Sequence, residues 1–153
     1  MSVYSYLNEC ITPLNLKALF TVICCSFSVG FERQYFGKPA GIRTSILIGM
    51  GAYLFVALSS SLIPESTDYS RVVGQIVTGI GFLGAGIMFN NGQLVQGVTS
   101  SAVIWVIAGI GCLIGFNKYG AGIAITIITL FVLFGISFLE HRFKKLRAGI
   151  HEK

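Results

Sequence analysis

The fold is decided by the stretch from Val72 to Asn117, which reads VVGQIVTGIGFLGAGIMFNNGQLVQGVTSSAVIWVIAGIGCLIGFN and contains no Asp, Glu, Lys or Arg. It is more than twice as long as the roughly 20 residues that cross the hydrocarbon core of a bilayer. An uncharged run of that length fits in lipid when it folds back on itself. We therefore predict an integral membrane protein.

The composition supports this prediction. Of the 153 residues, 54% are apolar and only 11% are charged, and the mean hydropathy is +0.77. Soluble domains carry a far larger charged share, so this chain lacks the polar residues that a water-facing surface needs. We predict a single transmembrane domain over residues 1–153, with the lipid bilayer as its surroundings and no nucleic acid as a partner.

Charges and turn residues divide the chain into five apolar segments. Each must be a helix, because hydrocarbon offers no hydrogen-bond partner to an unpaired backbone amide. The polar cluster Asn90-Asn91-Gly92-Gln93 divides the uncharged run in two. The predicted fold is an all-α, polytopic membrane bundle of about five transmembrane helices, over residues 14–31, 44–63, 72–89, 98–116 and 119–139, followed by a basic tail at 140–153.

The basic residues predict the orientation of the bundle. With the amino terminus outside, the inner segments hold eight Lys or Arg residues and the outer segments hold three. Basic residues accumulate on the cytoplasmic side of membrane proteins. We therefore expect the amino terminus outside and the carboxyl terminus inside, with the tail as a topology anchor that also attracts anionic lipid heads.

A first group of polar residues lies between the first two spans: Glu32, Arg33, Arg43 and Thr44. Glycines and a proline between them indicate a tight turn. Two interpretations are open. The segment is a solvated basic loop, or its charges fold back and Glu32 forms a buried ion pair with Arg43 at the membrane boundary, where an unpaired charge would be costly.

A second group opens the third span. Spacings of three and four residues place Asp68, Arg71, Gln75 and Thr78 along one face of a helix that descends into the bilayer. They serve as a helix cap and as interhelical hydrogen-bond donors, or they form the mouth of an ion or proton path. Glu65 and Asp68 could attract Mg2+, but two acids in a loop do not define a site. We expect no metal site and no cofactor.

A third group consists of glycines: Gly79, Gly81, Gly84 and Gly86. The segment at 79–84 matches the G-x-G-x-x-G fingerprint of dinucleotide-binding proteins. That fingerprint requires a preceding strand and an acidic residue about 20 positions later, whereas here no acid follows until Glu140. We reject nucleotide binding and expect these glycines to let helices pack closely, as in small-xxx-small pairs, or to bend the helix.

Three blocks of sequence carry a resemblance to a known family. They are ERQ at 32–34 with GKPAGIRT at 37–44, RVVGQIVTGIGFLGAG at 71–86, and GVTSSAVIW at 97–105. Their order and spacing resemble the membrane domain of the MgtC/SapB family over residues 14–139. The resemblance implies a multi-pass protein of the bacterial inner membrane that is connected with magnesium limitation, virulence and restraint of the ATP synthase. It also implies functional roles for the polar and glycine groups above.

No catalytic constellation is visible in the sequence. Both histidines, His141 and His151, lie in the basic tail, and the four cysteines have no C-x-x-C spacing. We expect a non-enzymatic regulator that acts through contacts with membrane partners such as the membrane sector of the ATP synthase. The alternative is a small ion or proton transporter or channel, for which five helices would require a homo-oligomer.

Overall fold

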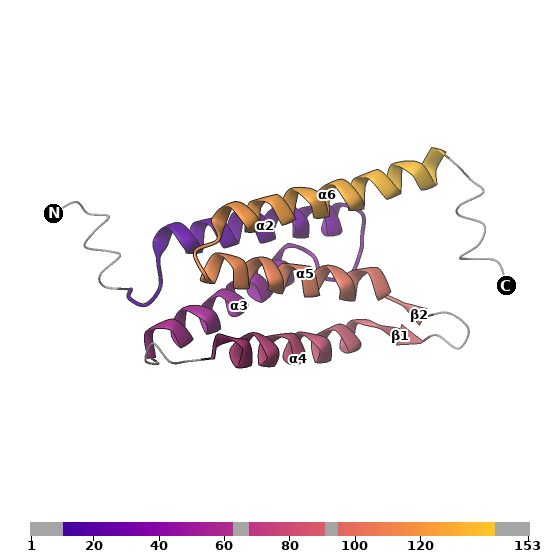
Figure 1. Ribbon diagram of the computed structural model, residues 1–153. Coiled ribbons are helices and arrows are strands. Elements are labelled where there is room, and N and C mark those ends of the chain that lie inside the picture. Colours follow the sequence, from indigo (N-terminus) through magenta and orange to yellow (C-terminus); the bar gives the residue numbers. More distant parts are fainter. Residues whose placement is uncertain (1–10, 63–67, 91–94, 143–153) are drawn as a thin grey trace.

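The structure, a computed structural model, describes residues 11–62, 68–90 and 95–142. These residues form five helices that lie side by side and alternate in direction (Figure 1). This confirms the predicted all-helical bundle, and each helix begins and ends within four residues of its predicted span. The helices are α2 (Leu16–Tyr35), α3 (Ile42–Leu62), α4 (Tyr69–Ile87), α5 (Val98–Gly115) and α6 (Tyr119–Arg142).

Four of the helices in the described segments, α3 to α6, are long and apolar enough to cross a bilayer. Helix α2 has a comparable length of 20 residues, but it carries Glu32 and Arg33 near its end and is not among these candidate spans. The chain is a multi-pass membrane protein. Its orientation, with the amino terminus outside, stays a prediction.

The chain reverses between α4 and α5, as the polar cluster at 90–93 predicts. Two short strands, β1 (Phe89–Asn90) and β2 (Val95–Gln96), pair antiparallel beyond the helix ends, and residues 91–94 lie outside the described part of the chain. Gly97 caps α5 with a φ of 87°. A side chain there would meet the Ile87 carbonyl, so both the conformation and the space require glycine.

Helix α5 forms the centre of the bundle and contacts the four other helices described. Its isoleucines at 104, 107, 110 and 114 are fully buried. Gly111 and Gly115 of α5 face α3: a Cβ at Gly111 would collide with the Gly49 carbonyl and Ala52, and one at Gly115 with Val56. Small residues thus bring the two helix backbones into close contact, as is usual in membrane bundles.

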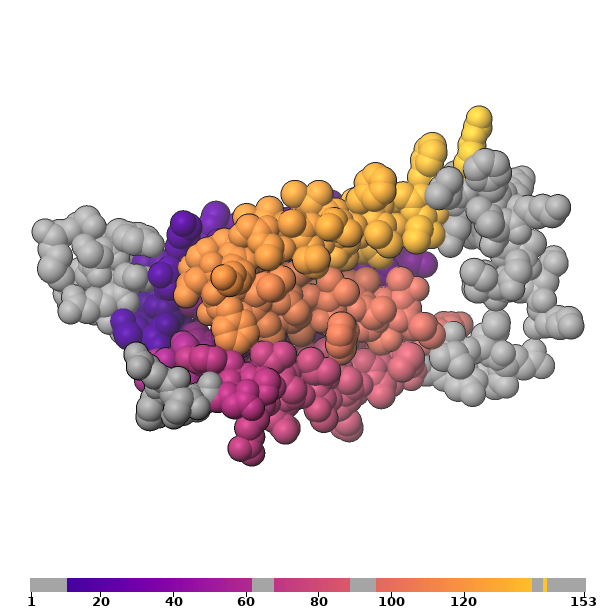
Figure 2. Space-filling view, viewed as in Figure 1, coloured from indigo at the N-terminus to yellow at the C-terminus, as the bar shows by residue number. Residues whose placement is uncertain are grey.

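Helices α4 and α6 lie at the edge of the bundle, and only 11% of each span is buried inside the chain. Figure 2 shows them as outer rows of the space-filling view, in magenta and orange. Large apolar side chains such as Phe82 and Phe131 are about four-fifths exposed. In a membrane these side chains face lipid or another protein. Because α4 lies at this edge, the polar and glycine groups that it carries are accessible from outside the bundle.

Candidate functional site

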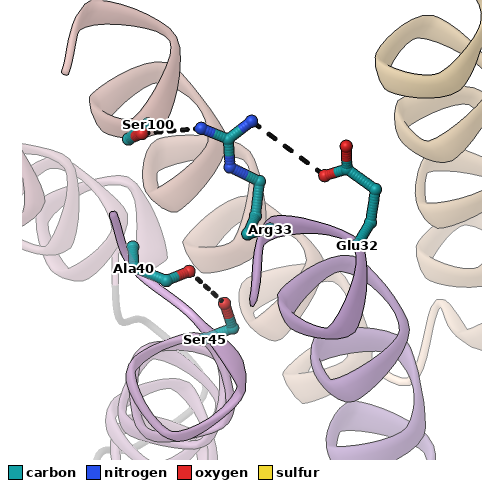
Figure 3. Close-up of polar contacts among 5 residues, drawn as sticks. All are labelled: Glu32, Arg33, Ala40, Ser45 and Ser100. Atoms are coloured by element: carbon teal, nitrogen blue, oxygen red, sulfur yellow. Dashed lines mark hydrogen bonds and ion pairs between the residues drawn. The ribbon is translucent and has the colours of Figure 1, made fainter. Parts of the chain in front are cut away.

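A buried charged cluster lies near the carboxyl end of α2. Glu32 and Arg33 are only 2% and 4% exposed, although α2 was predicted to end before them. Arg33 Nη2 donates a 2.6 Å hydrogen bond to Ser100 Oγ on α5, and Arg33 Nη1 lies 4.0 Å from Glu32 Oε2. Figure 3 shows the guanidinium between these two partners. The cluster therefore ties α2 to the central helix.

The cluster is incompletely satisfied within the described segments. Glu32 Oε2 and Arg33 Nε are buried without a hydrogen-bond partner, and the ion pair is at the long end of the distance range. Buried polar groups in native proteins are nearly always paired, and those that are not often mark functional positions. This is the most unusual chemistry among the residues described.

Of the two interpretations left open for this segment, the one in which Glu32 pairs with Arg43 is wrong. In the described residues the ion pair of Glu32 is with its neighbour Arg33, whereas Arg43 and Thr44 are exposed at the start of α3. The turn instead uses uncharged contacts: Gln34 Oε1 accepts a 3.2 Å hydrogen bond from the amide of Ile42. The solvated-loop interpretation therefore fits Arg43 but fails for Glu32 and Arg33, because α2 continues through both.

A groove of about 1240 Å3 runs between α3 and α4. It collects several residues that the sequence singled out, namely Thr44, Arg71, Gln75, Gly79 and Gly86. Most of its other lining residues are apolar. The predicted polar stripe is therefore split, since Arg71 and Gln75 line the groove while Asp68 and Thr78 do not.

The glycine run forms one continuous helix and does not break α4. Gly84 is buried, and a Cβ there would lie 3.4 Å from Ser101 Cβ on α5. Beside Gly79, Gly81 and Gly86 there is open space within the chain. Of these four glycines, only Gly84 therefore packs against the rest of the bundle, and the other three leave free surface.

Two neighbouring serines at the start of α5 connect these features, and sequence reasoning assigned them no role. Ser100 accepts the hydrogen bond from Arg33, and Ser101 lies against Gly84 of α4. A second missed contact places Ser26 of α2 directly over Gly49 of α3. The sequence did contain an indication of these contacts, because serines within apolar membrane spans commonly lie at helix–helix interfaces.

Asp68 caps the amino terminus of α4, as one of the two interpretations predicts. Its carboxylate accepts a 3.0 Å hydrogen bond from the amide of Ser70. Hydrogen bonds from the side chain and backbone of Ser70, followed by the nearby charge of Arg71, hold the pKa of Asp68 below its usual value. The other half of that interpretation is not seen, because no hydrogen bond from Gln75 to another helix occurs among the described residues.

We expect Asp68→Asn to lower the unfolding temperature slightly at pH 7, because asparagine keeps the cap and removes the charge at the helix amino terminus. The carboxylate contributes fully above its unfolded pKa of about 3.9, and the contribution is lost as the pH falls through the lower folded pKa. Thermal scans in detergent should show the gap between the two proteins closing below about pH 4. A gap that persists in strong acid would contradict this assignment.

Metal and thiol chemistry have little support in the described segments. No three His, Cys, Asp or Glu side chains converge there. Cys25 and Cys112 are buried as free thiols and Cys24 is exposed on α2. Cys10 and both histidines fall on residues whose side chains lie outside the described part of the chain.

Comparison with known proteins gives consistent matches. Residues 19–142 match the MgtC family. The chain is 42% identical over 125 residues to the "Putative magnesium transporter YhiD" of Escherichia coli, covering 77% of the chain and 58% of that protein. It is 37% identical over 130 residues to protein MgtC of Salmonella typhimurium, with coverages of 85% and 52%. The chain thus spans little more than half the length of these relatives. No solved structure gives a significant match.

Proposed function

Because the chain belongs to the MgtC family, we propose that it is a non-enzymatic regulator in the bacterial inner membrane, which acts through helix contacts with other membrane proteins. The name of its Escherichia coli relative suggests a connection with magnesium, and its helices make it a multi-pass membrane protein.

The observation that carries the proposal is the outer face of α4. Gly74, Thr78 and Gly81 follow one another at helical spacing and are all exposed. A Cβ at Gly74 or Gly81 would meet nothing within 4 Å, and the Thr78 hydroxyl donates to the Gly74 carbonyl of its own helix. We call these three residues the small-residue face.

A surface of this kind suits another helix better than it suits lipid. Within a bilayer the hydrophobic effect does not drive helices together, and association depends on close van der Waals packing that small residues permit. The same chain uses this principle where Gly111 and Gly115 meet α3. The small-residue face offers the same surface to a partner. The membrane sector of the ATP synthase is the candidate that the family resemblance suggests, and a second copy of the chain is another.

The test is a comparison of wild type with Gly81→Leu, which places a bulky side chain on the small-residue face. We expect the wild-type protein to co-purify in detergent with a stoichiometric membrane protein, and to lower ATP-driven proton pumping in inverted membrane vesicles. Gly81→Leu should lose both effects, because the added side chain separates the two helices.

The matched control is Gly109→Leu, which changes an exposed glycine of α5 with open space around it. This variant should keep both the partner and the effect on pumping. Recovery of no stoichiometric membrane protein with wild type, together with unchanged pumping, would disprove the proposal. Equal loss in both variants would also count against the small-residue face.

The alternative function, a small oligomeric transporter or channel, is suggested by the name of the Escherichia coli relative. In one copy the charged groups lie at opposite ends of the bundle, with Glu32 and Arg33 at one end and Arg71 at the other. The groove that begins at Arg71 is lined mostly by apolar residues. Such a surface provides no polar path for an ion.

We therefore expect liposomes that contain the purified protein to be no more permeable to protons or Mg2+ than empty liposomes. Fluorescent indicators trapped inside the vesicles would measure both fluxes. A flux above that of empty vesicles that falls on Arg71→Gln or Asp68→Asn would favour the transporter and contradict the contact mechanism.

A further inference from the structure

The groove between α3 and α4 adjoins the small-residue face of α4, but none of Gly74, Thr78 and Gly81 lines it. We propose that this groove binds one phospholipid molecule, with its phosphate on Arg71 and its acyl chains along the groove. The lipid site does not rest on the proposed regulatory contact.

The dimensions of the groove match a lipid. Its volume of about 1240 Å3 exceeds the roughly 300–1,000 Å3 of most small-molecule sites. On α4 it extends from Arg71 to Ile87, a distance of about 24 Å at the helical rise. One leaflet of the hydrocarbon core is only about 15 Å thick, so a lipid whose head lies at Arg71 can place its whole tail in the groove.

Glycines create much of the space. Gly51 of α3 and Gly79 and Gly86 of α4 line the groove, and a Cβ at any of them would meet nothing within 4 Å. The remaining lining includes apolar side chains of α3 and α4, such as Phe55 and Ile76. Because the glycines have no side chains, they leave room between the apolar side chains for the flexible acyl chains of a lipid.

The charge pattern selects an amphiphile. Arg71 is exposed at the amino end of α4 and has no ion pair within the described segments, while Gln75 one turn deeper also lines the groove. A cationic side chain at the membrane interface binds a phosphate head through charge-assisted hydrogen bonds. One cation at the end of an apolar groove therefore matches a phosphate head followed by acyl chains.

A second copy of the chain fits the groove less well. Its helix would have to bring a carboxylate to Arg71 at the same depth. Of the carboxylates whose side chains are described, Glu32 is buried in the bundle and Asp68 caps its own helix. The described part of a second copy thus offers no free anion to Arg71.

Native mass spectrometry of the full chain tests the site. The protein is released from nanodiscs that contain equal amounts of a phosphatidylglycerol and a diacylglycerol with the same acyl chains. We expect wild type to retain one phospholipid and little diacylglycerol. Arg71→Gln should reduce phospholipid retention roughly tenfold, the loss expected for a charged hydrogen bond. Arg71→Lys should retain most of it, and Lys118→Gln, which lies outside the groove, should retain all of it.

Filling the groove supplies a second measurement. Gly79→Leu should abolish retention while the unfolding temperature stays near that of wild type, because the new side chain enters open space. Retention that is unchanged in both Arg71→Gln and Gly79→Leu would overturn the site, and so would equal retention of the two lipids by wild type. A shift from dimer to monomer in Gly79→Leu without bound lipid in wild type would assign the groove to a second copy instead.

Discussion

Arg33→Met is expected to lower the free energy of unfolding by about 3–5 kcal/mol, the usual cost of removing one partner from a buried ion pair. The substitution keeps an unbranched apolar side chain in place of the arginine stem but leaves the Glu32 carboxylate buried at 2% exposure without its cation. It also removes the donor to Ser100. Thermal unfolding of the purified protein in detergent, followed by circular dichroism, measures the loss.

Two further variants make the result specific. The double variant Glu32→Gln/Arg33→Met removes both charges, so it should cost much less than Arg33→Met alone. Arg43→Met alters an exposed arginine at the same end of the bundle and should change stability little. If Arg43→Met proved as costly as Arg33→Met, the buried cluster would not be the source of the stability.

Gly111→Ala is expected to lower the free energy of unfolding by about 1–3 kcal/mol, the usual cost of overpacking a close contact. The new methyl group would overlap the carbonyl of Gly49 and approach Ala52 Cβ within 3.0 Å. Because the carbonyl belongs to the backbone of α3, it cannot move aside as a flexible side chain can. The two helices must separate, and the same thermal unfolding assay reports the loss.

The control for Gly111→Ala lies two residues earlier on the same helix. Gly109 has open space where a Cβ would be, so Gly109→Ala should stabilise the helix by roughly 0.5–1 kcal/mol through helix propensity alone. Opposite signs for the two glycines are therefore expected. A loss of stability in both would mean that the contact between α3 and α5 differs from the one described.

Hydropathy and charge predicted the bundle because the bilayer imposes helix and length on any apolar segment. The same reasoning misplaced Glu32 and Arg33 in a loop, since charges near the end of a span usually leave the membrane interior. The hydrogen-bond partner of Arg33 inside the bundle is Ser100, which is 67 positions away along the chain. Sequence reasoning from local pattern has no means to find such a partner.

The glycine run shows a second limit of the sequence. The sequence pattern is the same for three glycines of this run, but their surroundings differ. Gly79 lines the groove, Gly81 lies on the exposed small-residue face, and Gly84 packs against α5. Which face of a helix meets its neighbour depends on where the other helices lie. Hydropathy carries little of that information, because lipid and protein interior are similarly apolar.

The position of α4 at the edge of the bundle also has a consequence for assembly during synthesis. Helix α4 contacts α5 more extensively than it contacts α3, and its buried Gly84 faces Ser101 of α5. Since the amino-terminal part of a chain emerges first, α2 and α3 can join while α4 still lacks its main docking surface. Helix α4 therefore completes its packing only when α5 has followed.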